Sequence, residues 1–110
     1  MTKEAESVLS FLQYHCCGAQ RALRGTTVAE QCAMGYHRVR ACVDELRDAG
    51  HVICSSSHEP YGYYIPVCID EVARCADDLE ARGRDLLVKA AKLRRNHGLP
   101  PKQRLFEYAP

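Results

Sequence analysis

Residues 29–49 read AEQCAMGYHRVRACVDELRDA, and Gly50 follows. The spacing of apolar residues shifts phase near Ala33, which predicts a short helix, a bend and then a second helix over residues 36–49. Gly50 is well placed to end that second helix in a left-handed conformation. The second helix carries apolar residues on one face, which we expect to be buried: Val39, Val43 and Leu46.

The segments before this stretch predict one more helix and a loop. Residues 3–14 form a helical pattern with a single apolar face, made of Ala5, Val8, Leu9 and Leu12. Residues 15–25 contain two glycines and are typical of a loop. Thr27 and Glu30 fit a capping box, which predicts that the next helix begins at Val28.

The segments after Gly50 predict a β-hairpin and a long helix. Residues 51–55 and 62–66 are rich in strand-forming residues, and turn formers separate them. Pro66 indicates that the second strand ends there or lies at an edge. Residues 70–97 are typical of one helix, which Asp70 can cap and Gly98 can end.

Composition indicates a globular protein and excludes several classes. The chain has 110 residues, of which 46% are hydrophobic and 26% charged, and its net charge is +1. No apolar run is long enough to cross a bilayer, and no basic-then-apolar leader opens the sequence, so we expect a cytoplasmic protein without membrane contact. No nucleophile, base and orienting residue stand at recognisable spacing, so we expect neither enzyme activity nor a cofactor.

Seven cysteines are many for this length, yet no CxxC pair occurs. Structural zinc sites need ligand pairs that a short loop can bring together, and only Cys16 and Cys17 are close. We therefore predict reduced thiols, several of them in the core, and no metal site. A minor alternative is a thiol or metal sensor that uses His15, Cys16 and Cys17.

Residues 28–42 resemble the helix-turn-helix of the winged-helix DNA-binding superfamily. The resemblance rests on small or apolar residues at the positions that the two helices and their bend require: Val28, Ala29, Cys32, Ala33, Met34, Val39 and Cys42. Two departures are Ala33, where the family favours Gly, and Gly35, where it favours a Ser or Thr cap. The passage DELRDAGHVICSSSHEPYGYYI over residues 44–65 is similar to small winged-helix proteins of phages and prophages.

The resemblance implies a fold class and a function. The fold would be mainly α with a small β-hairpin (α+β): a winged helix-turn-helix over 1–67, with residues 25–27 as a possible third strand, and a long C-terminal helix. The chain would bind double-stranded DNA as a transcription regulator or replication accessory, with the helix at 36–49 in the major groove. The DNA-contacting residues would be Thr26, Thr27, Tyr36, His37, Arg38, Arg40, Ala41, Asp44, Arg47, Ser56, Ser57, His58 and Tyr61. Among them Arg47 would face a phosphate.

Two other interpretations of the same face remain open. Arg38 and Arg40 could pair with Asp44 on a helix face that is merely solvated. The winged helix could also be a protein-interaction module without DNA affinity.

The long helix, within segment 68–98, predicts a dimer. Apolar or small residues recur along it at alternating four- and three-residue steps, as a heptad seam does: Val72, Ala76, Leu79, Gly83, Leu86, Ala90 and Leu93. Residues 70–80 hold five acids and one Arg, and residues 82–104 hold eight bases and one Asp, so an antiparallel homodimer sets acid against base. Alternatively the helix packs on its own core, or its basic end contacts the DNA backbone through Lys89, Lys92, Arg94 and Arg95. In the tail, 99–110, Leu105, Phe106 and Tyr108 are available to dock elsewhere.

Overall fold

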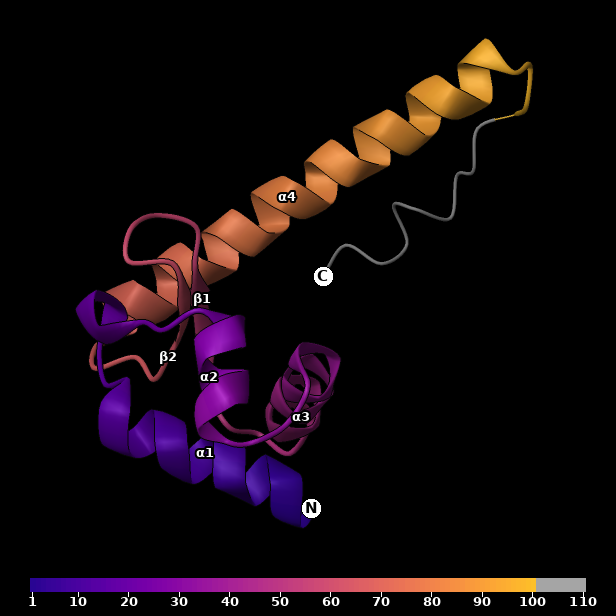
Figure 1. Cartoon of the computed structure of the whole chain (residues 1–110). Coiled ribbons are helices and arrows are strands. Elements are labelled where there is room, and N and C mark those ends of the chain that lie inside the picture. Colours follow the sequence, from indigo (N-terminus) through magenta and orange to yellow (C-terminus); the bar gives the residue numbers. More distant parts are fainter. Residues whose placement is uncertain (101–110) are drawn as a thin grey trace. The chain divides into compact units, whose positions relative to one another are not determined.

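The computed structural model describes residues 1–100 of the chain (Figure 1). The chain is mainly helical, with a small antiparallel sheet and a long C-terminal helix, which confirms the coarse fold class predicted from the sequence. Two compact units are present, one over Met1–Cys75 and a second that begins at Ala76. The elements are α1 Lys3–His15, the short 3-10 helix η1 Ala19–Arg21, α2 Gly25–Gln31, α3 Tyr36–Asp48, β1 Cys54–Ser56, β2 Gly62–Tyr64 and α4 Ile69–Asn96.

The core of the first unit lies where α1, α2 and α3 meet the hairpin, and α3 contacts both of the other helices (Figure 1). Thr2 caps α1 by accepting a hydrogen bond from the Ala5 amide at 3.1 Å, and its own hydroxyl donates to Glu45 of α3 at 2.8 Å. The largest side chains with an exposure below 2% are aliphatic groups and two thiols, residue types that are commonly buried. These side chains are Leu12, Leu46, Val8, Val28, Val39, Val43, Cys16 and Cys42.

The bend between α2 and α3 is present where the sequence predicts it. Ala33 has a φ of 54°, a left-handed conformation that an L-residue rarely adopts. The Met34 amide donates to the Ala29 carbonyl at 3.0 Å, and the Met34 side chain packs against the core. Gly35 then leads into α3 with an extended backbone. At the other end of α3, Gly50 has a φ of 96°, as predicted.

The predicted start of α2 is wrong. The helix begins at Gly25 rather than Val28, because the Val28 amide already donates to the Arg24 carbonyl at 3.0 Å. Thr27 therefore lies inside the first turn and does not cap it. Residues 25–27 are helical and form no third strand. The pairing that was expected of them falls to Leu23, whose amide and carbonyl both bond to Tyr63 of β2, at 3.2 and 2.9 Å.

The hairpin is shorter than the sequence predicts. The strands β1 and β2 pair antiparallel with Cys54 opposite Tyr64, while residues 51–53 stay outside the ladder. The His51 amide instead donates to the Leu46 carbonyl at 3.0 Å and closes the end of α3. On the far side of β2, the Leu23 backbone approaches so closely that a Cβ on Gly62 would stand 1.9 Å from the Leu23 oxygen. The glycine is therefore required there.

The first two turns of α4 belong to the first unit. Asp70 was expected to cap α4 but lies inside its first turn. The Glu71 carboxylate has the capping role instead, since it accepts from the Val67 and Ala19 amides, each at 2.8 Å. These bonds lower the pKa of Glu71. Cys75 is buried and hydrogen-bonds to the backbone of Ser55 in β1.

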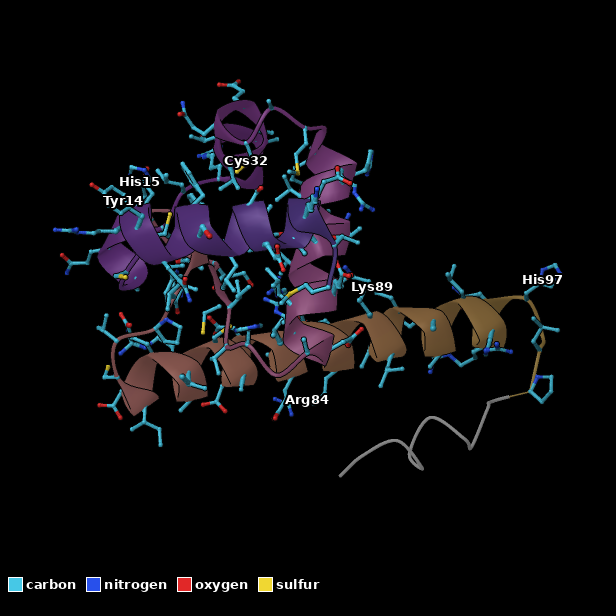
Figure 2. The ribbon with its side chains drawn as sticks, turned by 90° about the horizontal axis from the view of Figure 1, so that it is seen from below. Tyr14, His15, Cys32, Arg84, Lys89 and His97 are labelled. Atoms are coloured by element: carbon cyan, nitrogen blue, oxygen red, sulfur yellow. The ribbon has the colours of Figure 1, made fainter. Side chains whose placement is uncertain are left out.

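In the second unit, α4 continues through Gly83 to Asn96, one residue short of the predicted end. Gly98 has a φ of 77°, and the Leu99 amide donates to the Arg94 carbonyl at 2.8 Å to close the helix. Arg84, Lys89 and His97 extend from the helix surface (Figure 2). The leucines of the predicted seam are exposed in the single chain, at 43% for Leu79, 65% for Leu86 and 71% for Leu93.

Candidate nucleic-acid interface

The outer face of α3 is exposed, as the sequence predicts. Its inner face buries Val39, Cys42, Val43 and Leu46, so the residues between them must point away from the core. Tyr36, Arg40 and Asp44 follow one another at four-residue steps and form one row along the helix. The exposed predicted residues are Tyr36, His37, Arg38, Arg40, Ala41 and Asp44.

The guanidinium group of Arg38 forms an ion pair with a residue of another helix. Its Nη2 atom lies 2.8 Å from Oε1 of Glu4 on α1, so the pair is Arg38–Glu4 and does not involve Asp44. The hydrogen bond to Glu4 raises the pKa of Arg38. Since both side chains remain about half exposed, the pair is weak and water can compete with it. Arg40 therefore carries the less encumbered charge on this face.

Arg47 does not face outward as predicted. Its Nε atom donates to the Ile53 carbonyl at 3.0 Å, and its Nη2 is buried without a hydrogen-bond partner among the described residues. The side chain connects the last turn of α3 to the segment before β1. Arg47 stands four residues after the buried Val43, so helix periodicity already places it beside the inner face of α3, a signal that the sequence reasoning did not use.

Beside this face, α2, α3 and β2 pack against one another through Gly25, Tyr36 and Tyr63. A Cβ on Gly25 would stand 2.5 Å from the Tyr36 ring and 3.3 Å from the Tyr63 ring, so both rings pack directly against the glycine backbone. Burial raises the pKa of Tyr63, and the nearby Tyr36 adds to the effect. The start of the outward row on α3 is thus held in place by packing.

An open pocket of about 450 Å³, which we call the Arg24 pocket, lies between the starts of α2 and α3 and the hairpin. The guanidinium carbon of Arg24 stands 5.4 Å from the centre of the Tyr61 ring, within cation–π range. The pocket is lined by Arg24, Gly25, Thr26, Tyr36, Tyr61 and Gly62. It brings together Thr26, Tyr36 and Tyr61, which were predicted to contact DNA. It also contains Arg24, which was not among the predicted residues. No spacing in the sequence links Arg24 to Tyr61, because the hairpin brings them together.

Some polar groups of the hairpin loop form hydrogen bonds within the loop itself. The Ser56 hydroxyl donates to the His58 carbonyl at 2.6 Å and accepts from the His58 amide at 3.2 Å. Ser56 is thus less available to a phosphate than predicted. The side chains of Ser57 and His58 are exposed, whereas Thr27 on α2 is half-buried.

The cysteines are all free thiols, as predicted, but they differ in access. Cys16, Cys42, Cys54 and Cys75 are buried, Cys32 is half-buried, and Cys17 and Cys68 are exposed. Burial raises the pKa of Cys54 to about 11, with the adjacent Cys75 adding to it. The His15 ring lies 4.7 Å from the Phe11 ring in a tilted arrangement and 4.7 Å from the Tyr14 ring in an edge-on arrangement, measured between ring centres. Figure 2 shows Tyr14 and His15 side by side. Within residues 1–100, no three His, Cys, Asp or Glu side chains are placed to hold a metal ion.

Comparisons with known proteins leave the chain without an assigned relative. No family model, no curated protein and no solved structure matches it. Across the described helices, none is long and apolar enough to span a membrane.

Proposed function

We propose that this chain is a winged helix-turn-helix protein that binds double-stranded DNA in the cytoplasm, as a phage- or prophage-type transcription regulator or replication accessory. The order of helix, paired segment at Leu23, two helices and hairpin supports the winged-helix assignment. The observation that carries the function is one surface built from two elements: the outward row of α3 and, beside it, the Arg24 pocket at the hairpin. The seven unpaired thiols fit a reducing compartment.

The outward row of α3 has the chemistry for reading base edges. The helix has 13 residues, or about 20 Å of length, and B-DNA's major groove is about 12 Å wide, enough for a helix. Arg40 would form two hydrogen bonds to a guanine edge, and Asp44 one turn later would accept from a cytosine amino group. Tyr36, fixed by Gly25, would contact the backbone or a base at the entrance of the groove.

Arg24 would supply the charge that the hairpin itself lacks. Residues 54–64 contain no Lys or Arg, whereas DNA-binding hairpins commonly use such a residue on a phosphate. The position of Arg24 over Tyr61 restricts its side chain, which lowers the entropy that a phosphate contact would cost. The hairpin and Arg24 together would therefore hold one phosphate beside the groove that α3 enters.

The second candidate function is a protein-interaction module. It is favoured by the modest charge of the surface, since Glu4 pairs with Arg38 and Asp44 stands beside Arg40. We also propose that the chain forms a homodimer through α4, because the leucines of its predicted seam are exposed. The acidic start and basic end of the seam favour antiparallel pairing.

The proposal is tested by titrating random duplex DNA with the full chain at several salt concentrations. We expect binding that weakens with salt, and Arg40→Ala should lose at least about tenfold in affinity. Arg38→Ala should lose less, because Glu4 already engages that side chain. Arg82→Ala removes the same charge from α4 and is the matched control, expected to change affinity little. Absence of duplex binding by the unmodified chain at low salt would refute DNA binding and favour the interaction module.

A further inference from the structure

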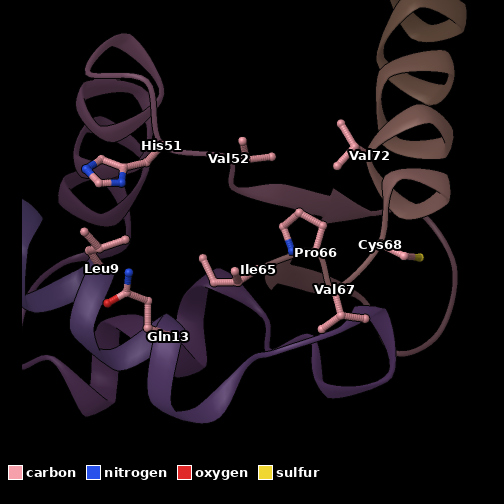
Figure 3. A pocket seen from close by; sticks show the side chains of 9 residues that line it. All are labelled: Leu9, Gln13, His51, Val52, Ile65, Pro66, Val67, Cys68 and Val72. Carbon is pink, nitrogen blue, oxygen red and sulfur yellow. The ribbon is translucent and has the colours of Figure 1, made fainter.

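A second pocket, which we call the Val72 pocket, opens between α1, the end of β2 and the first turns of α4. Its volume is about 410 Å³, and its walls are mainly aliphatic, with Leu9, Val52, Ile65, Val67 and Val72 among them. The side chains of Val52 and Val72 point toward one another across the opening (Figure 3). None of the residues proposed to contact DNA lines this pocket.

The rim of the Val72 pocket exposes apolar side chains to solvent. Val52 is 53% exposed, Val67 is 68% exposed, and Ile69 next to it is 81% exposed. Scattered apolar residues are ordinary on a protein surface, but a group of them around an apolar pocket is typical of a binding site.

The pocket shares one residue with the predicted seam of α4. Val72 lines the pocket and is also the first seam residue. In an antiparallel pair, the start of one α4 lies beside the end of the other. Heptad packing sets Val72 against the partner's Ala90 or the seam position one heptad later, residue 97. In both registers the partner chain reaches residues 68–72 with the segment that begins at its Ala90.

Charge supports the same arrangement. Asp70 and Glu71 begin the helix beside the pocket, and the last two turns of α4 carry Lys89, Lys92, Arg94 and Arg95. An antiparallel partner would bring these bases near those acids, whereas a parallel partner would bring acid near acid. After Leu99, which is 49% exposed, the sequence continues as PPKQRLFEYAP, where residues 101–110 lie outside the described residues.

We propose that the Val72 pocket of one copy receives the C-terminal segment of a second copy, with Leu99 and then Leu105, Phe106 or Tyr108 as the apolar groups that enter it. This inference rests on the proposed homodimer. The partner copy then completes a pocket that the first copy leaves open, and the exchange is reciprocal because the pair is symmetric.

The first test places a photo-reactive benzoylphenylalanine at Phe106 of the full chain and irradiates it. We expect a covalent dimer whose cross-linked peptide contains residues of the Val72 pocket. A cross-link within one chain, a cross-link to another surface, or no dimer at all would overturn the proposal.

The second test measures the dimer dissociation constant by sedimentation equilibrium. Phe106→Asp on the segment and Val67→Asp on the pocket rim should each weaken the dimer by roughly ten- to hundredfold, because each places a charge where an apolar contact is expected. Tyr14→Asp changes a side chain that is 82% exposed on α1 outside the pocket and is the control, expected to leave the dimer unchanged. Circular dichroism on each variant establishes that it folds, and equal constants for all three variants would overturn the proposal.

Separate measurements can refute the DNA-binding function and the exchange of C-terminal segments. Duplex titration of the same proteins reports on α3 and the Arg24 pocket, whereas the cross-link and the dimer constant report on the Val72 pocket. A cross-linked dimer without duplex affinity would refute only the DNA-binding function. Duplex affinity in a chain that stays monomeric would refute the homodimer and the exchange of C-terminal segments, but not the DNA-binding function.

Discussion

The two pockets of the first unit have similar volumes, about 450 and 410 Å³, but opposite chemistry. The Arg24 pocket combines a guanidinium, a threonine and two tyrosines, whereas the Val72 pocket is walled mainly by aliphatic residues. Strand β2 connects them, since Gly62 at its start lines the first and Ile65 just after its end lines the second. One short strand thus positions a polar surface suited to phosphate and an apolar surface suited to another protein segment.

The largest effect on stability is expected from Gly62→Ala, a change in the wall of the Arg24 pocket. The new Cβ would meet the Leu23 oxygen at 1.9 Å, and the φ of 128° is itself unfavourable for alanine. We expect a loss of about 3 kcal/mol or more in the free energy of unfolding, measured by urea denaturation. Gly50→Ala is the matched control: its φ is also positive, but nothing lies within 4 Å, so only about 1 kcal/mol should be lost. Equal losses would show that the contact with Leu23 is unimportant.

Gly25→Ala should separate DNA binding from stability. Its Cβ would displace the Tyr36 ring, which stands 2.5 Å away and is the movable end of a side chain. The first contact of the outward row would then be misplaced, so we expect a loss of about tenfold in duplex affinity with little change in the midpoint of urea denaturation. Dimerisation through the Val72 pocket should be unaffected. Unchanged duplex affinity would argue that Tyr36 makes no DNA contact.

Arg47→Met tests the correction to the predicted DNA-binding set. Methionine removes both the charge and the Nε hydrogen bond to the Ile53 carbonyl, which should cost about 1 kcal/mol in unfolding free energy. The salt dependence of duplex binding should not change, because the side chain does not reach the proposed interface. A flatter salt dependence would restore Arg47 as a phosphate contact.

The smallest expected effect is on the pH dependence of the unfolding free energy, through Glu71 beside the Val72 pocket. Glu71 holds the amide of Val67, a residue of the pocket wall, and its pKa is lowered by its bonds to the amides of Val67 and Ala19. A carboxylate with a lowered pKa stabilises the fold above its unfolded-state pKa, near 4.3, and this contribution is lost as pH falls through the folded-state value. Unfolding free energy should thus decline below about pH 4.5, and Glu71→Gln should flatten that decline. An identical pH profile for the variant would remove Glu71 from this role.

The local sequence pattern predicted the helices and the hairpin, but it did not predict contacts between residues that are distant in the sequence. The turn at Ala33, the end of α3 at Gly50, and the extent of α4 follow from periodicity and glycine placement, and all three are confirmed. The start of α2 was wrong because Leu23 pairs with Tyr63 of the distant β2, and the helix begins directly after this paired segment. The same reason explains why Arg24 over Tyr61 and Arg38 with Glu4 were missed. DNA contact and the dimer stay predictions.

The hydrogen bonds of Cys75 have a consequence for how copies of this protein can associate. The thiol accepts from the Ser55 amide at 3.4 Å and donates to the Ser55 carbonyl at 3.6 Å, so it occupies the outer edge of β1 much as a neighbouring strand would. An open strand edge invites another strand to add to the sheet, which is a common route to aggregation. The opposite edge of the ladder is occupied by Leu23. Sheet extension is thereby blocked on both sides.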